Sequence, residues 1–324
     1  MKHIIISRTD SIGDVVLTLP LAGYLKFKFP EVKISFIGTR YTFPVISRSG
    51  FVDNALIKEE LNKSTIEPNA DAILFVFPDK DVAKWAKSRK IKIRVGTSHR
   101  LMHFFYSNRR VNFSRRKSGL HEAQLNFKLL EGIGINYIPE KSEIPKWYGL
   151  EKVELKRENK EEKRIILHPR SKGSAREWPL EKYEELVYNF DKNQVLFLIS
   201  GTKEDGQAII KGSPKLMNKP NIQDMCGTSD LDGLINLISG VDGLIAASTG
   251  PLHIAAAFGI PTLGLYPPLK PMDPERWGPL GENARYKTSK EECLSCPGGP
   301  HCPCMQNIET DFLRDWVRDL VEKA

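Results

Sequence analysis

Short apolar runs alternate with helical patterns through the first half of the chain. The runs lie at His3–Ser7, Lys33–Gly38, Ala55–Ile57, Ala72–Phe77 and Ile91–Gly96. Their length is typical of buried strands. Between the first two runs, Val15–Phe29 carries apolar residues at helical spacing, and Pro30 follows it as a stop. Strands that alternate with helices of about 10–15 residues predict βαβ units and a parallel sheet.

The same pattern restarts after a charged segment. Leu150–Arg164 reads LEKVELKRENKEEKR, which is typical of an exposed linker. Beyond it, RIILHP, QVLFLISG, GLIAAS and PTLGLY predict strands, while PLEKYEELVYNF, DLDGLINLISG and a segment from about Leu252 to Phe258 predict helices. Two such halves of about 150 residues predict two doubly wound domains facing a cleft, with ligands at the carboxyl ends of the strands.

We expect the first domain to span residues 1–155, the linker 156–163 and the second domain 164–307. The last segment, 308–324, contains IETDFLRDWVRDLVEK and predicts an amphipathic helix that packs on a domain. We expect that domain to be the N-terminal one.

Composition agrees with two domains, because 324 residues exceed what one core usually serves. No apolar stretch approaches the roughly 18–20 residues of a membrane span, and Ile4–Ile6 is too short for a signal peptide. The sequence therefore predicts a cytoplasmic protein whose five cysteines form no disulfide framework. A net charge of +8 permits an anionic partner such as nucleic acid, an acidic membrane surface or a phosphorylated substrate.

Two strand-to-helix junctions in the second half carry candidate chemistry. In GLIAASTGPLHIAAAFGIPTLGLY, Gly250 and Pro251 suit a helix start that binds an anion, and His253 can donate to a phosphate oxygen. Ordinary capping by Ser248 or Thr249 explains the segment equally well. In LHPRSKGSAREWP, a loop with several cations can neutralise a diphosphate, or it is a solvated basic loop.

A third strand exit, LISGTKEDG, offers Glu204 and Asp205 to a ribose or base, although an acidic helix start also explains it. Neither G-x-G-x-x-G nor G-x-x-x-x-G-K-[ST] occurs, which disfavours dinucleotide and P-loop binding. At the N-terminal junction SRTDSIGDVVLTLP, Asp10 and Asp14 flank Gly13, and either carboxylate can be a helix cap or a catalytic group.

Four segments in order, SIGDVVLTLP, HP…EWP, STGPLHIAAAFGIPTLGLY and ERWGPLG, resemble glycosyltransferase family 9, the ADP-heptose:lipopolysaccharide heptosyltransferases. The resemblance implies a GT-B fold, with two Rossmann-like domains that bind the acceptor and the nucleotide sugar. It implies that Asp14 takes the proton from the acceptor hydroxyl in an inverting transfer. The Gly250–His253 helix start and Lys172 or Arg176 would stabilise the leaving ADP without a metal.

Further positions follow from the resemblance. The implied donor-binding residues are Ser171, Lys172, Arg176, Glu204 or Asp205, Thr228, Ser229, Ser248, Thr249, Gly250 and His253. The family usually has aspartate where this chain has Ser248, which removes a carboxylate beside the donor sugar. On the acceptor side the residues are Arg8, Gly13, Arg100, Arg109 and Arg110, with Arg8 contacting a carboxylate or the diphosphate.

The segment VGTSHRLMHFFYSNRRVNFSRRK mixes aromatic residues with cations. It favours contact with an anionic lipid-linked saccharide acceptor and with the inner-membrane surface. A solvated basic loop is the alternative, and nucleic-acid binding is disfavoured because no RRM, KH or zinc-finger pattern occurs.

The cysteines of CLSCPGGPHCPC, at positions 293, 296, 302 and 304, can in principle hold zinc. Their loop is short and Cys-x-Cys is unusual spacing, so we favour reduced thiols and no cofactor besides the nucleotide-sugar substrate. Two other functions remain open at this point. One is another GT-B enzyme such as a nucleotide-sugar 2-epimerase, and the other is a non-catalytic nucleotide-binding protein at the membrane surface.

Overall fold

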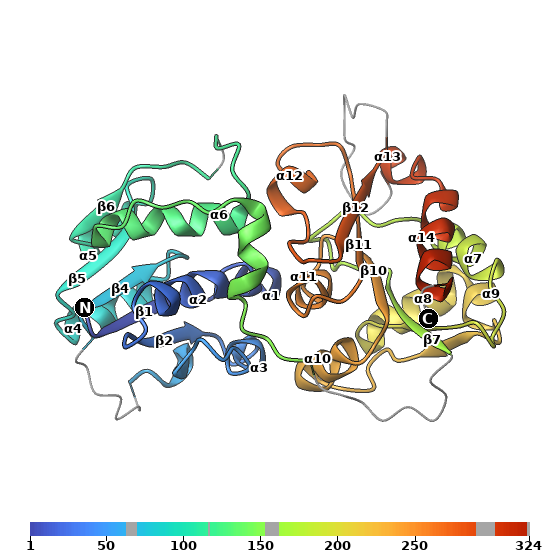
Figure 1. Ribbon diagram of the computed structural model, residues 1–324, viewed down its shortest axis with the longest axis horizontal. Coiled ribbons are helices and arrows are strands. Elements are labelled where there is room, and N and C mark those ends of the chain that lie inside the picture. The colour runs from blue at the N-terminus through green and yellow to red at the C-terminus, as the bar shows by residue number, and fades with distance from the viewer. Residues whose placement is uncertain (63–69, 116, 153–161, 290–301, 323–324) are drawn as a thin grey trace. The chain divides into compact units, whose positions relative to one another are not determined.

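The computed structural model describes residues 1–62, 70–115, 117–152, 162–289 and 302–322. The chain divides into two compact units, Met1–Glu151 and Lys152–Ala324 (Figure 1). Of the predicted linker 156–163, only the last two residues lie within the described part, and Lys163 already begins a strand.

The first unit is built on one sheet of six parallel strands in the order β3-β2-β1-β4-β5-β6. The strands are β1 His3–Ser7, β2 Lys33–Gly38, β3 Asn54–Ile57, β4 Ala72–Phe75, β5 Ile93–Thr97 and β6 Arg109–Val111. The helices are α1 Ile12–Val16, α2 Leu19–Lys28, α3 Phe43–Ile46, α4 Lys80–Ser88, α5 Leu101–Tyr106 and α6 Glu122–Phe127, with 3₁₀ segments at Lys58–Glu60, Lys128–Ile133 and Lys141–Trp147. The chain winds outward from β1 to β3 and then restarts at β4, so the winding reverses between β1 and β4.

The predicted helix Val15–Phe29 is wrong in its bounds, because two helices replace it. The first helix begins at Ile12, and the helical chain breaks at Leu17 and Thr18 before α2. The break has two local causes. Pro20 has no N–H to donate, and the Thr18 hydroxyl donates to the carbonyl of Asp14 at 2.8 Å. As a result, Asp14 lies in the first turn of a short helix that directly follows β1.

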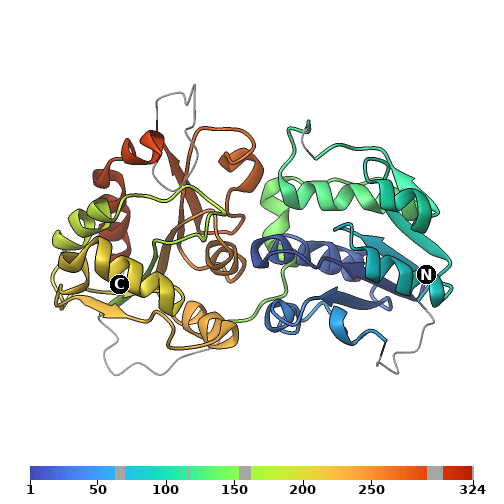
Figure 2. The ribbon, with the colours of Figure 1, turned by 180° about the vertical axis from the view of Figure 1, so that it is seen from behind.

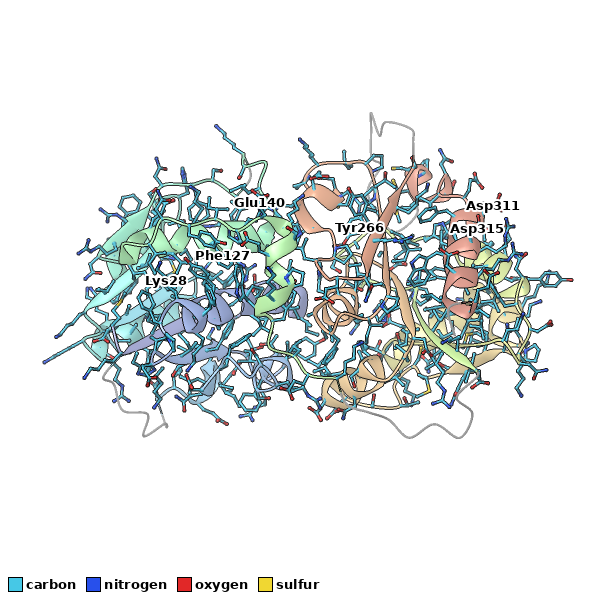
Figure 3. The ribbon with its side chains drawn as sticks, in the orientation of Figure 1. Lys28, Phe127, Glu140, Tyr266, Asp311 and Asp315 are labelled. Atoms are coloured by element: carbon cyan, nitrogen blue, oxygen red, sulfur yellow. The ribbon has the colours of Figure 1, made fainter. Side chains whose placement is uncertain are left out.

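An aromatic cluster closes the first unit on the side of α2. Tyr24 stacks on Tyr137 with ring centroids 4.6 Å apart, and it meets Phe127 and Trp147 at 5.4 Å each. A side-chain carbon on Gly23 would lie 2.6 Å from Cβ of Trp147, so the close packing of this segment on α2 requires glycine. Figure 3 shows Phe127 on α6 pointing into this unit.

The second unit repeats the topology of the first, with the strand order β12-β11-β10-β7-β8-β9. The strands are β7 Lys163–His168, β8 Val195–Ile199, β9 Ile222–Asp224, β10 Gly243–Ala247, β11 Thr262–Tyr266 and β12 Ala284–Thr288. The helices are α7 Leu180–Tyr188, α8 Lys203–Gly212, α9 Pro214–Met217, α10 Leu231–Ser239, α11 Gly250–Ala257, α12 Pro274–Trp277, α13 Pro303–Gln306 and α14 Thr310–Glu322. All described pairings are parallel, and the prediction of two doubly wound domains is confirmed.

The C-terminal helix α14 belongs to the second unit. Leu313, Trp316 and Val317 are buried in the core that also contains residues of α7, and the two helices lie side by side in Figures 1 and 2. Figure 3 shows Asp311 and Asp315 on the outer side of α14. The amphipathic pattern is confirmed, but our expectation that the helix packs on the N-terminal domain is wrong. Across the described helices, none combines the length and the apolar character needed to cross a membrane.

Candidate active site

In the first unit, the reversal of winding places the end of β1 beside the end of β4. In open parallel sheets, such a switch point is where ligands bind. The residues that follow β1 are Arg8 and then the loop into α1, and the residues that follow β4 lead to Asp79 at the start of α4. The sequence therefore brings its N-terminal junction to the position where doubly wound domains have their sites.

Arg8 is the centre of this junction. Its side chain is buried, with an exposed fraction of 4%, and its guanidinium binds three carboxylates. Nη2 donates to Oδ1 of Asp14, Nε donates to Asp10 at 2.7 Å, and Nη1 donates to Glu122 at 3.2 Å. Burial raises the pKa of Asp10, although the Arg8 cation beside it opposes that rise. The guanidinium thus holds Asp14 in one orientation at the start of α1.

Neither aspartate of the junction is a helix cap. Ser11 is the N-cap residue of α1, and its side chain makes no capping hydrogen bond. Instead, the Ser11 hydroxyl donates to Oδ2 of Asp14. The Asp14 carboxylate is therefore bound on one oxygen by Arg8 and on the other by an exposed serine, and 17% of its side chain is exposed. Asp10 instead forms an ion pair with Arg8.

Glu122 extends the network into the protein interior. It lies at the start of α6, is 1% exposed, and also binds Nη1 of Arg115. Arg115 donates a further hydrogen bond to Asn126 at 3.0 Å, and Asn126 donates to the carbonyl of Leu17 at 3.0 Å. Two guanidinium groups thus face the carboxylates of Asp10, Asp14 and Glu122, and the paired charges make the burial tolerable.

Asp79 is the other carboxylate near this switch point, and it is fully engaged. It accepts hydrogen bonds from the Thr9 hydroxyl at 2.8 Å and the Lys58 ammonium at 2.7 Å, and it caps α4 through Asp81 and Val82. Burial disfavours its ionised form, but these hydrogen bonds outweigh burial and lower the pKa of Asp79. Its role is structural, which leaves Asp14 as the better candidate for chemistry.

In the second unit, the switch point lies between β7 and β10. The loop after β7 is organised by the buried carboxylate of Glu177. That carboxylate accepts from the backbone N–H of Ser171 at 2.8 Å and from its hydroxyl at 3.0 Å, and it pairs with Arg170 at 2.8 Å. Because the Ser171 hydroxyl is used inside the loop, this residue shapes the loop rather than facing a ligand.

Lys172 and Gly173 stand at the tip of this loop with φ angles of 50° and 81°. The left-handed backbone turns the tip sharply, and the Lys172 side chain is exposed. The next strand, β8, leads to Glu204, whose pKa is lowered by hydrogen bonds at the start of α8 and by the nearby Lys172 cation. The predicted basic loop and the predicted acidic segment therefore lie together in the second unit.

The start of α8 separates Glu204 from Asp205. Thr202 and Asp205 form a capping box: the Thr202 N–H donates to Oδ2 of Asp205 at 2.9 Å, and the Asp205 N–H donates to the Thr202 hydroxyl at 3.3 Å. Asp205 is therefore a structural residue, and Glu204 is the carboxylate that remains exposed to a ligand.

At the other wall of the switch point, α11 begins at Gly250 directly after β10. Thr249 is its N-cap residue but makes no capping bond, and its hydroxyl is buried with no hydrogen-bond partner among the described residues. The preceding Ser248 is hydrogen-bonded to Tyr266, which lies in the interior of this unit. His253 lies in the same first turn of α11 and is 3% exposed. An unpaired hydroxyl beside the free N–H groups of a helix start is suited to a phosphate.

A family comparison connects these observations. The model of glycosyltransferase family 9 (heptosyltransferase) matches residues 69–301. The chain belongs to glycosyltransferase family 9. The match covers parts of both units, including the loop after β7 and the start of α11, and it confirms the resemblance found in the sequence.

Related sequences and solved structures match this family 9 protein over most of its length. It is 23% identical over 288 residues to the lipopolysaccharide core heptosyltransferase OpsX of Haemophilus influenzae, covering 82% of this chain and 79% of the relative. A family 9 structure from Veillonella parvula matches 100% of this chain and 98% of that chain, with a TM-score of 0.77 and 17% identity. The Escherichia coli ADP-heptose lipopolysaccharide heptosyltransferase II matches 100% of both chains, with a TM-score of 0.73 and 18% identity. The predicted GT-B fold class is thereby confirmed.

The predicted acceptor residues do not form one cluster. Arg8 and Gly13 lie at the switch point of the first unit, but Arg8 is occupied by protein carboxylates. Arg109 and Arg110 lie on β6, and Arg100 precedes α5. Because β6 is three strands from β1, about 14 Å separates these strands at the usual spacing. The three arginines are exposed, and their contact with an acceptor stays a prediction.

The remaining donor residues also stay predictions. Thr228 and Ser229 are exposed on the loop before α10, and the Thr228 hydroxyl donates to the carbonyl of Met225 at 2.9 Å. Arg176 is half-buried. The residues that our sequence reasoning missed are Arg115, Glu122, Asn126 and Glu177. The first three act on Arg8 from more than one hundred positions away, so no local spacing signals them.

The cysteine cluster is only partly described. Cys293 and Cys296 lie outside the described residues, while Cys302 and Cys304 are buried with sulfur atoms 2.8 Å apart. Among the side chains that the structure describes, no group of three or more His, Cys, Asp or Glu residues is arranged to hold a metal ion. Our expectation of reduced thiols without zinc therefore stays a prediction.

Proposed function

We propose that this family 9 protein is an inverting glycosyltransferase that moves heptose, or a related sugar, from an ADP-sugar to a lipopolysaccharide core acceptor, with Asp14 as general base. The observation that carries the proposal is the carboxylate of Asp14, held by the buried Arg8 at the switch point of the first unit. A carboxylate fixed in this way is positioned for proton transfer before the substrate arrives.

The two oxygens of Asp14 take different parts in the proposed step. Oδ1 is bound to Arg8, while Oδ2 accepts from the exposed hydroxyl of Ser11. An acceptor hydroxyl that displaces the Ser11 hydroxyl would donate to the same oxygen. Its oxygen then forms a bond to the anomeric carbon as the bond from that carbon to the ADP oxygen breaks, and the proton passes to Oδ2. A single displacement of this kind inverts the anomeric configuration.

The second unit would bind the donor. The start of α11 would receive the diphosphate at Gly250 and at the Thr249 hydroxyl, which has no hydrogen-bond partner among the described residues. Lys172 and Arg176 would add positive charge. Glu204 would accept hydrogen bonds from the nucleoside. These groups would stabilise the charge that develops on the leaving ADP, so the proposed transfer needs no metal ion.

The choice of substrates to test comes from the relatives. The E. coli structure is named for ADP-heptose, and the H. influenzae relative for the lipopolysaccharide core. Ser248 is the position at which the donor sugar can differ, since a hydroxyl replaces the usual carboxylate there. For this reason we include a related sugar beside heptose in the proposal.

The test is a transfer assay with ADP-heptose and lipopolysaccharide truncated before its first heptose. We expect release of ADP, a product heavier by one heptose, and an inverted anomeric centre in the NMR spectrum of the product. The same reaction without acceptor should release no ADP beyond background, which separates transfer from hydrolysis or epimerisation of the donor. Transfer should also continue after divalent ions are removed by a chelator. No transfer with any ADP-, UDP- or GDP-sugar would overturn the proposal, and a rescue by added metal would overturn its metal-free part.

Lys172→Ala tests the donor site, with Lys203→Ala as a matched control. Both lysines are near the start of α8, but only Lys172 stands at the tip of the loop after β7. We expect Lys172→Ala to raise the Kd for ADP by about tenfold, the usual effect of losing one charge-assisted hydrogen bond, while the control changes it little. Equal effects would show that the lysines act through net charge alone.

A further inference from the structure

We propose that the helix α5 and the cations around it form a docking surface for an anionic lipid bilayer. We define the α5 surface as Leu101, Phe104 and Phe105 together with Arg100, Arg109 and Arg110. The inference goes beyond the proposed transfer, because it concerns attachment to a surface and can be tested without any sugar nucleotide.

The apolar members of the α5 surface are unusually exposed. Leu101 is 77% exposed, Phe104 52% and Phe105 67%. Their positions, i, i+3 and i+4, place the three side chains on one face of the helix. In water, such a face leaves apolar area uncovered next to charged residues, which is typical of helices that lie in a membrane interface.

The exposure does not come from a loosely attached helix. The opposite side of α5 is anchored by His103, which is buried and accepts the N–H of Thr97 at 2.9 Å. Met102 and Tyr106 pack against the core of the first unit, and the carbonyl of Tyr106 accepts from Nε of Arg94 at 2.8 Å. One side of the helix is therefore anchored to the first unit, where α5 lies beside β5 and β6 (Figure 1), while Leu101, Phe104 and Phe105 remain exposed.

The charge around α5 matches an anionic surface. Residues 82–121 contain 12 lysines and arginines and no aspartate or glutamate, whereas the whole chain has a net charge of only +8. The rest of the chain is therefore acidic on balance. Within the α5 surface, the Arg110 guanidinium lies 4.6 Å from the centre of the Phe104 ring, so cations and apolar groups are directly adjacent.

Simpler explanations account for only part of this arrangement. Arg109 and Arg110 lie on β6, an edge strand, where charges prevent pairing with another chain. Edge protection explains the arginines but not the outward Leu101, Phe104 and Phe105. Nucleic acid would use the aromatic rings for stacking, yet Leu101, the most exposed of the three, has no stacking function. An anionic lipid surface would bind all six residues of the α5 surface.

Sedimentation with vesicles tests the proposal. The protein should sediment with vesicles of phosphatidylglycerol and phosphatidylethanolamine, but not with phosphatidylcholine alone. Raising the salt from about 50 mM to about 500 mM should weaken the binding without abolishing it, because only the electrostatic part is screened. Equal binding to both vesicle types, or no binding to either, would overturn the proposal.

Variants locate the binding on the molecule. We expect the double variant Phe104→Ala/Phe105→Ala, and separately Arg109→Glu/Arg110→Glu, to lower vesicle affinity by about tenfold or more. The matched controls are Tyr188→Ala and Lys219→Glu, since Tyr188 is 76% exposed with the Lys219 ammonium 4.1 Å from its ring centre. The controls should bind vesicles as the unchanged protein does. If the aromatic double variant lowers the Tm, Leu101→Ser replaces it in the test.

Two outcomes contradict the proposal directly. One is binding of the aromatic variant that equals that of the controls. The other is tight binding of single-stranded RNA through the same residues with no vesicle binding, which would assign the surface to nucleic acid. Because neither measurement involves turnover, a failure of the proposed transferase activity leaves this test unaffected.

Discussion

Arg8 and Asp14 form an ion pair in which a buried guanidinium binds one oxygen of a carboxylate that is itself partly exposed. Arg8 directly follows β1, and Asp14 lies in the first turn of α1. The guanidinium of Arg8 is also held on its other side by Glu122 and Asn126 from α6. This ion pair orients Asp14 through Oδ1 alone, so Oδ2 takes no part in it.

Asp14→Asn should lower kcat for transfer by about 10²- to 10⁴-fold, because the amide keeps the shape but cannot accept the proton. The Kd for ADP should stay within about twofold, since the proposed donor groups belong to the second unit. Steady-state kinetics and calorimetry measure the two quantities. Asp10→Asn is the matched control, because Asp10 pairs with Nε of the same arginine. This variant should lower kcat by less than about tenfold. Equal losses in the two variants would show that the charge of the network, and not one base, matters.

Glu122→Gln should lower kcat for transfer while the Kd for ADP stays nearly unchanged. The amide keeps the size of the side chain but removes a negative charge from the network that positions Arg8, and Arg8 in turn orients Asp14. The buried hydrogen bonds that weaken should also cost about 1–3 kcal/mol of unfolding free energy. Glu31→Gln, at an exposed position of the same unit, is the control. A loss of stability with an unchanged kcat would mean that Glu122 only supports the fold.

Glu204→Ala and Asp205→Ala should have opposite signatures. Glu204 is exposed, so its loss should weaken ADP binding by about tenfold or more while the Tm falls less than in Asp205→Ala. Asp205 belongs to the capping box with Thr202, so its loss should cost about 0.5–2 kcal/mol of unfolding free energy and leave nucleotide affinity nearly unchanged. Calorimetry with ADP and urea unfolding separate the two. The reverse pattern would assign nucleotide binding to Asp205 and the structural role to Glu204.

The strands were the most predictable part of the fold. Strands buried on both faces read as continuous apolar runs, and β1 and β2 match the predicted bounds residue by residue. The break between α1 and α2 escaped prediction because apolar spacing continues through it, while the deciding contact is a single Thr18 hydroxyl bond. Short β6 escaped for another reason: its Arg109 and Arg110 carry the polarity of a loop, and only pairing with β5 makes them a strand.

The residues of the candidate site were likewise predictable only in part. Asp14, Gly250 and Lys172 follow strands in the sequence, so topology alone brings them to the ends of the two sheets. The partners that orient them could not be predicted, because Glu122 reaches Arg8 from 114 positions away. Glu177 is close to Ser171 in sequence, but its buried carboxylate looks in sequence like any glutamate before a tryptophan.

His168 should make the second unit less stable in mild acid. Burial lowers the pKa of this imidazole from 6.5 to about 4, and Nδ1 shares a hydrogen bond with the Ser200 hydroxyl at 2.9 Å. In the unfolded chain the group binds a proton near pH 6.5, but in the folded protein it stays neutral until about pH 4. The stabilising effect is therefore complete above pH 6.5 and is lost progressively as the pH falls toward 4, by about 1–3 kcal/mol.

Urea unfolding at pH 7, 6 and 5, monitored in the full chain, should show this loss. His168→Gln keeps a polar partner for Ser200 but has no group that titrates, so its unfolding free energy should fall less between pH 7 and 5 than that of the unchanged protein. His99→Gln replaces an exposed histidine and should leave the original pH dependence intact. If His168→Gln and His99→Gln give the same slope, the acid sensitivity comes from other groups, and the buried carboxylates around Arg8 become the first to examine.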